Sequence, residues 1–250
     1  MGLSSFLANR RPDGTLGKVL LYELLQAFCA LVFILAYRVR VRGARNVPPR
    51  GPVLLASNHQ SFLDPPLVGS FVRPRHLSFV ARVGLFQFGP FGWLISALNS
   101  VPINDEAGDA GAIREILKRL GAGHAVLIFP EGSRTTDGGQ KSFKRGVALL
   151  VKRAKCPVVP VAVEGCFDAW GPGRKLPSLI GHRVAVTYGR PIPYDELMKD
   201  GAQGALDRIA REVDRLRLQT RSDMRRATRG TYPSRGPGDQ PGEGIKATHP

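Results

Sequence analysis

Cysteine is scarce in this chain of 250 residues, which contains only Cys29, Cys156 and Cys166. Three scattered thiols are too few for a disulfide framework, so we expect a protein of a reducing compartment. No C-x-x-C pair is present either, and without one the sequence does not indicate a zinc site. We therefore expect a protein that binds no metal.

Acidic residues are also few. Asp and Glu number 20 against 36 Lys and Arg, which gives a formal net charge of +16. Such a chain favours an anionic partner: a nucleic acid, a membrane surface or a phosphorylated substrate. Hydrophobic residues make up 43% of the chain, which excludes wholesale disorder. The sequence shows no internal repeat, and its length fits one domain with short appendages.

The segment from Val19 to Tyr37 is apolar apart from Glu23 and Gln26. As a helix it would be about 28 Å long, close to the thickness of the hydrocarbon core of a bilayer. No small-residue cleavage site follows, so we do not expect a signal peptide. The helix either spans the membrane or lies in the interface with Glu23 turned to water. A buried helix of a soluble domain is the third, less favoured alternative.

Five arginines follow this segment: Arg38, Arg40, Arg42, Arg45 and Arg50. No aromatic residues for base stacking are interleaved with them, so we expect no nucleic-acid partner. Directly after an apolar helix, such a cluster suits anionic lipid headgroups, to which each cation adds about 1 kcal/mol. In a spanning helix this bias places the following domain in the cytoplasm. We therefore expect a membrane-associated protein whose main domain lies on the cytoplasmic face.

Beyond Pro52, short apolar runs alternate with amphipathic segments, which predicts strands separated by helices. Pro160 lies within one of these strands and predicts an edge position or a bulge there. The alternation predicts an α/β fold with a mixed, mostly parallel sheet flanked by helices. The expected strands are 53–57, 77–80, 101–103, 125–129, 158–163 and 184–188, and the expected helices are 65–72, 110–120, 143–153 and 205–218.

We divide the chain into three parts. Residues 1–45 form a leader and a membrane helix with a basic flank, and residues 46–220 form the main domain. Residues 221–250 have no apolar periodicity and contain five Gly and four Pro, so we expect a disordered basic tail there.

His59 and Asp64 follow the first strand of the main domain and are five residues apart. On a regular helix they would lie about 140° apart, so they can meet only if a turn intervenes. Pro65 keeps Asp64 out of the helical region, which makes Asp64 a candidate N-cap that faces His59 at the strand end. A carboxylate beside an imidazole suits the deprotonation of an alcohol. By spacing alone, a capping Asp beside a loop His fits equally well.

A second polar segment, Phe129 to Thr135, follows the strongest strand. The carboxyl ends of parallel strands line one crevice, so this loop belongs at the same edge as His59. Gly132 permits close approach of a ligand, and Ser133 and Arg134 offer donors to a phosphate. The alternative is a surface loop with a solvated Arg.

The two segments together, Asn58-His59…Asp64 and Phe129-Pro130-Glu131-Gly132-Ser133-Arg134, resemble the glycerophospholipid acyltransferases of the lysophosphatidic acid acyltransferase (PlsC-like) type. The resemblance covers about residues 40–195. It includes residues 85–98 (LFQFGPFGWLISAL), 143–146 (FKRG) and 189–192 (GRPI).

This resemblance implies the roles of the site residues. His59 would be the general base on the acceptor's hydroxyl and Asp64 its orienting partner. The substrate-binding residues would be Glu131, Gly132, Ser133, Arg134 and Lys144, with the cations on the acceptor's phosphate.

The resemblance also implies the reaction. Acyl-CoA or acyl carrier protein would donate a fatty acyl group to 1-acylglycerol 3-phosphate (lysophosphatidic acid), which gives phosphatidic acid for phospholipid biosynthesis. No cofactor is implied, because the thioester is already activated. The expected partners are membrane lipids, the donor and the lysophospholipid acceptor.

One segment departs from the family pattern, in which an Arg follows a short apolar strand between the two motifs. Here residues 101–106 read VPINDE. Two acids in place of a cation weaken recognition of a phosphomonoester. Either Arg82 or Lys144 compensates, or the acceptor is a different lysolipid or alcohol. From another class, the chain could be a non-catalytic lipid-binding module of the same fold.

Overall fold

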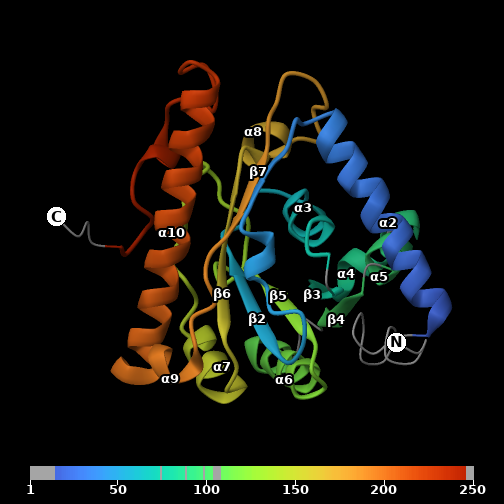
Figure 1. The fold of residues 1–250 in the computed structure, drawn as a ribbon, viewed down its shortest axis with the longest axis vertical. Helices are drawn as coiled ribbons and strands as arrows, with labels where there is room; N and C mark the ends of the chain where they lie inside the picture. The colour runs from blue at the N-terminus through green and yellow to red at the C-terminus, as the bar shows by residue number, and fades with distance from the viewer. Residues whose placement is uncertain (1–14, 74, 88, 98, 104–107, 246–250) are drawn as a thin grey trace.

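A seven-stranded sheet runs through the centre of the protein in the order β1-β7-β6-β2-β5-β3-β4. The computed structural model (Figure 1) describes residues 15–73, 75–87, 89–97, 99–103 and 108–245. All neighbouring strands are parallel except β6 and β7, which are antiparallel. This confirms the predicted mixed, mostly parallel sheet. The strands are β1 (Arg40–Arg42), β2 (Val53–Ser57), β3 (Leu77–Arg82), β4 (Ser100–Ile103), β5 (Ala125–Ile128), β6 (Val158–Glu164) and β7 (Ala185–Tyr188).

Helices cover both faces of the sheet (Figure 1). On one face lie α2 (Leu16–Leu35) and α3 (Asp64–Ser70), and on the other lie α6 (Gly108–Gly121), α7 (Gly146–Ala154) and α10 (Gly201–Ala227). Strand residues alternate between the two cores, because Leu55 packs with the first layer and Leu54 with the second. The shorter helices are α4 (Val83–Phe86), α5 (Gly89–Ala97), α8 (Cys166–Trp170) and α9 (Tyr194–Leu197).

Pro160 lies in β6, which is an interior strand between β7 and β2. Val158 pairs with Ile192, and Val161 pairs with Tyr188. Between these two pairs, β6 advances by three residues while the segment beside it, from β7 to Ile192, advances by four. A bulge therefore lies at Pro160, where the missing N–H of proline falls on the shift in register. The bulge alternative is correct and the edge alternative is wrong.

Helix α2 packs one side against the domain and exposes the other. Its length and composition suffice to cross a membrane. Its buried residues are Val19, Tyr22, Gln26, Ala30 and Phe33. Its exposed apolar residues, the outer stripe, are Leu16, Leu20, Leu24, Phe28, Leu31, Ile34 and Leu35.

Polar contacts fix the inner side of α2. The Gln26 side-chain amide donates to the carbonyls of Gly69 and Val72, at 2.8 and 3.1 Å, near the end of α3. Glu23 contacts His76 Nε2 at 3.4 Å, and 30% of its side chain remains exposed. Glu23 therefore lies at the border between the inner side of α2 and the solvent.

The structure draws the N-terminal boundary differently from the sequence. Strand β1 lies before residue 46 and pairs with β7, and Phe33 and Tyr37 belong to the same buried cluster as Leu55. Residues 16–45 are therefore part of the domain's packing. Strand β1 was not predicted, because its three residues, Arg-Val-Arg, have the charged composition of an exposed edge.

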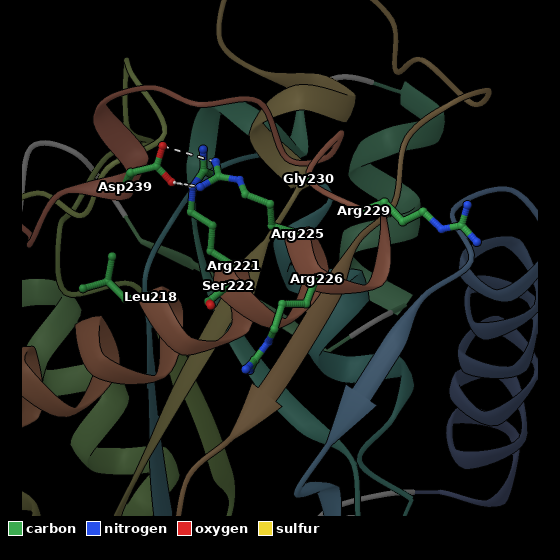
Figure 2. A pocket seen from close by; sticks show the side chains of 8 residues that line it. All are labelled: Leu218, Arg221, Ser222, Arg225, Arg226, Arg229, Gly230 and Asp239. Atoms are coloured by element: carbon green, nitrogen blue, oxygen red, sulfur yellow. Dashed lines mark hydrogen bonds and ion pairs between the residues drawn. The ribbon is translucent and has the colours of Figure 1, made fainter.

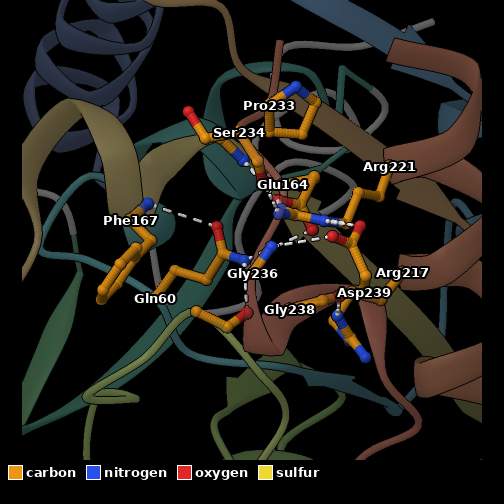
Figure 3. Close-up of polar contacts among 12 residues, drawn as sticks. Gln60, Glu164, Phe167, Arg217, Arg221, Pro233, Ser234, Gly236, Gly238 and Asp239 are labelled. Carbon is orange, nitrogen blue, oxygen red and sulfur yellow. Dashed lines mark hydrogen bonds and ion pairs between the residues drawn. The ribbon is translucent and has the colours of Figure 1, made fainter. Parts of the chain in front are cut away.

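The C-terminal boundary also differs, because residues 221–245 are ordered. Helix α10 continues to Ala227, and the residues after it, 228–245 (the C-terminal segment), fold back onto the domain. Figure 3 shows the Arg221 guanidinium between two carboxylates, Glu164 at 2.6 Å and Asp239 at 2.8 Å. Arg217 donates to the carbonyls of Gly238 and Gln240. The predicted disorder is wrong for residues 221–245 because charge-assisted hydrogen bonds hold them in place of apolar packing.

A surface groove of about 630 Å³ opens beside this network (Figure 2). In Figure 2, Arg221 and Arg225 converge on Asp239, whereas Arg226 and Arg229 point away from it. Other carbonyl and carboxylate partners also occupy Arg221 and Arg225. Two of the guanidinium groups that line the groove, those of Arg221 and Arg225, are therefore already engaged within the fold.

Candidate active site

The site begins where β2 ends. The Asn58 side-chain amide donates to the Val163 carbonyl at 3.0 Å and accepts from the Val163 N–H at 2.8 Å. This pair of bonds replaces the strand pairing at the point where the β2 backbone turns away from β6. His59, the next residue, therefore leaves the sheet from a fixed position.

Asp64 and His59 meet as the sequence predicted. Asp64 Oδ2 lies 2.8 Å from His59 Nδ1 and also accepts the backbone N–H groups of Gln60 at 2.6 Å and Ser61 at 2.7 Å. The Asp64 side chain is fully buried. The acceptor at Nδ1 places a proton there in neutral His59, which leaves the Nε2 lone pair to act as a base.

Asp64 is not the N-cap that we predicted. It is the first residue of α3, Leu63 precedes it at the cap position, and no side-chain cap bond is present. Its carboxylate instead accepts N–H groups of the preceding turn, which is how two residues five apart come to face each other.

Burial, followed by the charge of Asp64, raises the pKa of the Cys166 thiol well above its ordinary value.

The loop after β5 lies at the same edge of the sheet, because β2 and β5 are parallel neighbours. The Phe129 ring stacks on the His59 imidazole, with 4.0 Å between the ring centres and 20° between the planes. The Thr135 N–H donates to the His59 carbonyl at 2.8 Å. The two polar segments of the sequence thus form one site around His59.

Glu131 joins two loops through its carboxyl group. Oε1 accepts the His59 N–H at 2.8 Å, and Oε2 accepts the Lys141 N–H at 3.1 Å. Burial raises the pKa of Glu131 to about 8, against a lowering by these two hydrogen bonds. Both oxygens serve the backbone, so Glu131 contributes to the site by positioning His59 and the Lys141 loop.

The remaining predicted binding residues lie along this loop. Gly132 has φ +71°, and a Cβ there would overlap the Lys144 side chain, so Lys144 lies directly over Gly132. Ser133 Oγ accepts from Lys141 Nζ at 2.8 Å. The Arg134 guanidinium carbon lies 3.7 Å from the centre of the Phe62 ring. The loop whose backbone bonds to His59 therefore carries the cations that anion binding requires.

The segment that departs from the family pattern stays untested. Asn104, Asp105 and Glu106 lie outside the described residues, as does the side chain of Arg82. Within the described residues, no group of three or more His, Cys, Asp or Glu side chains could hold a metal ion.

Two contributors to the site were not predicted from the sequence, Phe129 and Gln60. Gln60 is buried, and its amide reaches the carbonyl of Gly138 and the carboxylate of Glu164, each at 3.4 Å (Figure 3). Its Oε1 accepts from the Phe167 N–H at 3.3 Å. Phe129 directly follows the end of β5, and Gln60 directly follows His59. These positions in the sequence were the available signal for both residues.

Comparisons with known proteins identify the family of the chain. The family model for acyltransferases matches residues 38–164. The chain is 32% identical over 183 residues to the 1-acyl-sn-glycerol-3-phosphate acyltransferase alpha of Ovis aries, covering 71% of this chain and 62% of the relative. It is 31% identical over 160 residues to a chloroplastic 1-acyl-sn-glycerol-3-phosphate acyltransferase of Arabidopsis thaliana, covering 62% of this chain and 44% of the relative.

A solved structure is similar over a larger share of the chain. The crystal structure of the 1-acyl-sn-glycerophosphate acyltransferase PlsC from Thermotoga maritima superimposes with a TM-score of 0.66 at 27% identity. The match covers 80% of each chain. By its shared fold and by a family match over about half its length, the chain belongs to the acyltransferase family.

Proposed function

We propose that this protein transfers a fatty acyl group from a thioester to the free hydroxyl of lysophosphatidic acid, which gives phosphatidic acid. The observation that carries the proposal is the His59–Asp64 pair, in which Asp64 engages Nδ1 and the Nε2 lone pair serves as the base. The curated relatives are named as 1-acyl-sn-glycerol-3-phosphate acyltransferases, which supports this acceptor.

The geometry supports a direct transfer. His59 Nε2 takes the hydroxyl proton while the acceptor oxygen attacks the thioester carbonyl. The tetrahedral intermediate then expels the thiolate, and the imidazolium returns the proton to that sulfur. Asp64 stabilises the imidazolium between these two steps. The products are the ester and a free thiol on CoA or on acyl carrier protein, so atoms and charge balance.

The cations of the β5 loop support binding of a phosphate. Arg134 and Lys144 lie on the loop whose backbone bonds to His59. A charged phosphate held there would place the acceptor hydroxyl within reach of the base. The negative residues Asp105 and Glu106 favour a second candidate, acyl transfer to a lysolipid with a phosphodiester or with no phosphate.

The outer stripe of α2 supports attachment to a membrane, where the lipid substrate lies. Seven large apolar side chains are exposed along this one helix. The arginines that follow it favour the cytoplasmic face. A membrane-attached site would receive a lysolipid without first moving it through water.

The test is acyl transfer by membranes that contain the wild-type protein, His59→Ala or the exposed control Lys199→Ala. Labelled acyl-CoA and acyl carrier protein are each paired with lysophosphatidic acid, glycerol 3-phosphate, lysophosphatidylcholine and a phosphate-free lysolipid. We expect product from lysophosphatidic acid that falls about 10²–10⁴-fold in His59→Ala only. Product from another acceptor alone would favour the second candidate. Activity that His59→Ala retains would overturn the mechanism.

A further inference from the structure

The loop between α8 and β7 exposes three large aliphatic side chains. Leu176 is 78% exposed, Leu179 is 52% exposed and Ile180 is 89% exposed. Single exposed apolar residues are ordinary on a folded protein, but three on one short loop form a patch. Patches of this kind mark a surface that another apolar phase covers.

The base of this loop is fixed to α8. The Ser178 N–H donates to the Ala169 carbonyl at 2.9 Å, and Trp170 Nε1 donates to the Arg174 carbonyl at 3.0 Å. The Arg174 guanidinium donates to the Asp168 carbonyl at 2.7 Å. These bonds hold the loop open, so its apolar tip points outward and does not collapse onto the domain.

The charged residues of the loop itself have one sign. No Asp or Glu occurs between Asp168 and Asp195, whereas Arg174 and Lys175 are exposed directly before the tip. An aliphatic tip flanked by cations matches an anionic lipid surface, where the apolar groups enter the acyl region and the cations meet headgroups.

The loop returns to the sheet beside the C-terminal end of α2. The Val184 N–H, just after the loop, donates at 3.3 Å to the carbonyl of Tyr37, just after α2. Figure 1 shows the loop and this end of α2 at the same end of the molecule. The last exposed residues of the outer stripe, Ile34 and Leu35, lie there. The loop tip and the outer stripe therefore expose apolar side chains at the same end of the molecule.

Helix α8, to which the loop is fixed, is joined to the turn of residues 59–64 (the catalytic turn). Ser61 Oγ donates to the Trp170 carbonyl at 2.7 Å, and the Phe62 and Trp170 rings meet edge to face at 5.5 Å. Ser61 in turn gives its N–H to Asp64. Trp170, at the base of the loop, is thus two hydrogen bonds from Asp64.

We propose that residues 174–180 form a second membrane contact, distinct from α2. Leu176, Leu179 and Ile180 enter the lipid, and Arg174 and Lys175 bind anionic headgroups. This contact places the catalytic turn at the bilayer surface. This inference rests on the proposed attachment to a membrane, and it does not depend on which lipid accepts the acyl group.

The test measures how deeply the tip enters the bilayer. The full chain, with Cys29→Ala, carries an environment-sensitive fluorophore at Ile180→Cys, while Cys156 and Cys166 are buried. It is reconstituted in vesicles of phosphatidylcholine with phosphatidylglycerol. The matched control is Gln203→Cys, exposed in the first turn of α10.

We expect a blue-shifted emission at position 180, quenched by lipids brominated in their acyl chains, and a solvent-like emission at position 203. Solvent-like emission at both positions would overturn the proposal. A blue shift at position 180 that arises in detergent only when acyl-CoA or acyl carrier protein is added would also overturn it, because the loop would then serve the donor.

The cations are tested separately with Arg174→Gln/Lys175→Gln. We expect this variant to need a larger share of phosphatidylglycerol for half of the blue shift, with an apparent affinity about tenfold lower. The control is the double variant Lys199→Gln/Arg211→Gln, which changes two exposed cations in and just before α10. This control should leave the phosphatidylglycerol midpoint of the blue shift unchanged. An unchanged midpoint in the loop variant would remove the headgroup contact from the proposal.

Discussion

Glu131 serves as a connector between loops, and its protonation should therefore affect stability. The carboxyl group is buried, and its two oxygens accept the N–H groups of His59 and Lys141. Burial raises its pKa to about 8 in the folded chain. The unfolded chain releases this proton near pH 4.5, the group's ordinary pKa.

We predict that Glu131 makes the protein less stable as the pH rises from about 5 to 8. Between these values the folded chain binds more protons than the unfolded chain, so the free energy of unfolding falls with pH. Glu131→Gln removes this titration, and its unfolding free energy should change less over the same range. Urea unfolding of both proteins at a series of pH values measures the difference. Parallel curves would show that Glu131 is ionised in the folded chain.

At the scale of elements, charged and polar side chains connect the C-terminal segment to the turn that holds His59. Asp239 accepts from Arg221 at 2.8 Å and from Arg225 at 2.6 Å. Burial raises the pKa of Asp239, but the hydrogen bonds from these two arginines outweigh it and hold the pKa well below its usual range. Arg221 also donates a hydrogen bond to Glu164. Glu164 in turn accepts one from Gln60, which directly follows His59 in the sequence.

We predict that Asp239→Asn lowers the free energy of unfolding by about 2 kcal/mol, because two guanidinium groups lose a charged partner. The matched control is Glu212→Gln, which breaks an exposed pair with Arg215 and should cost less than about 0.5 kcal/mol. Denaturant unfolding of the full chain measures both. Equal small effects would mean that the C-terminal segment is held by something other than Asp239.

Sequence patterns located the elements that bury apolar side chains and missed those held by polar contacts. The run Val53–Ser57 predicted β2 with the bounds that the structure has, because it is buried on both faces. The prolines after Asp64 correctly predicted that Asp64 faces His59. The same pattern wrongly predicted Asp64 as the N-cap, whereas it is the first residue of α3. The C-terminal segment depends on Arg221 meeting Asp239 and Glu164, and no local pattern reports such long-range pairs.

At the scale of the whole molecule, α2 belongs to two surfaces at once. Its inner side stacks Tyr22 on His76 with 3.8 Å between ring centres, and its Gln26 amide binds carbonyls at the end of α3. Helix α3 begins at Asp64, so α2 supports the helix that carries the carboxylate facing His59. Among the residues that the structure describes, the outer stripe is exposed on the other side of the same helix.

We predict that the two sides of α2 can be separated by mutation. Removing residues 1–36 exposes the apolar surface under Tyr22 and Phe33 and leaves α3 without Gln26, so the remainder should lose its cooperative melting transition. Leu20→Gln/Leu24→Gln/Phe28→Gln changes only exposed positions and should retain the wild-type melting temperature while moving protein from the membrane to the soluble fraction. Circular dichroism and fractionation measure the two effects. A truncated chain that melts like the wild type would mean that α2 is only an anchor and that the domain folds without it.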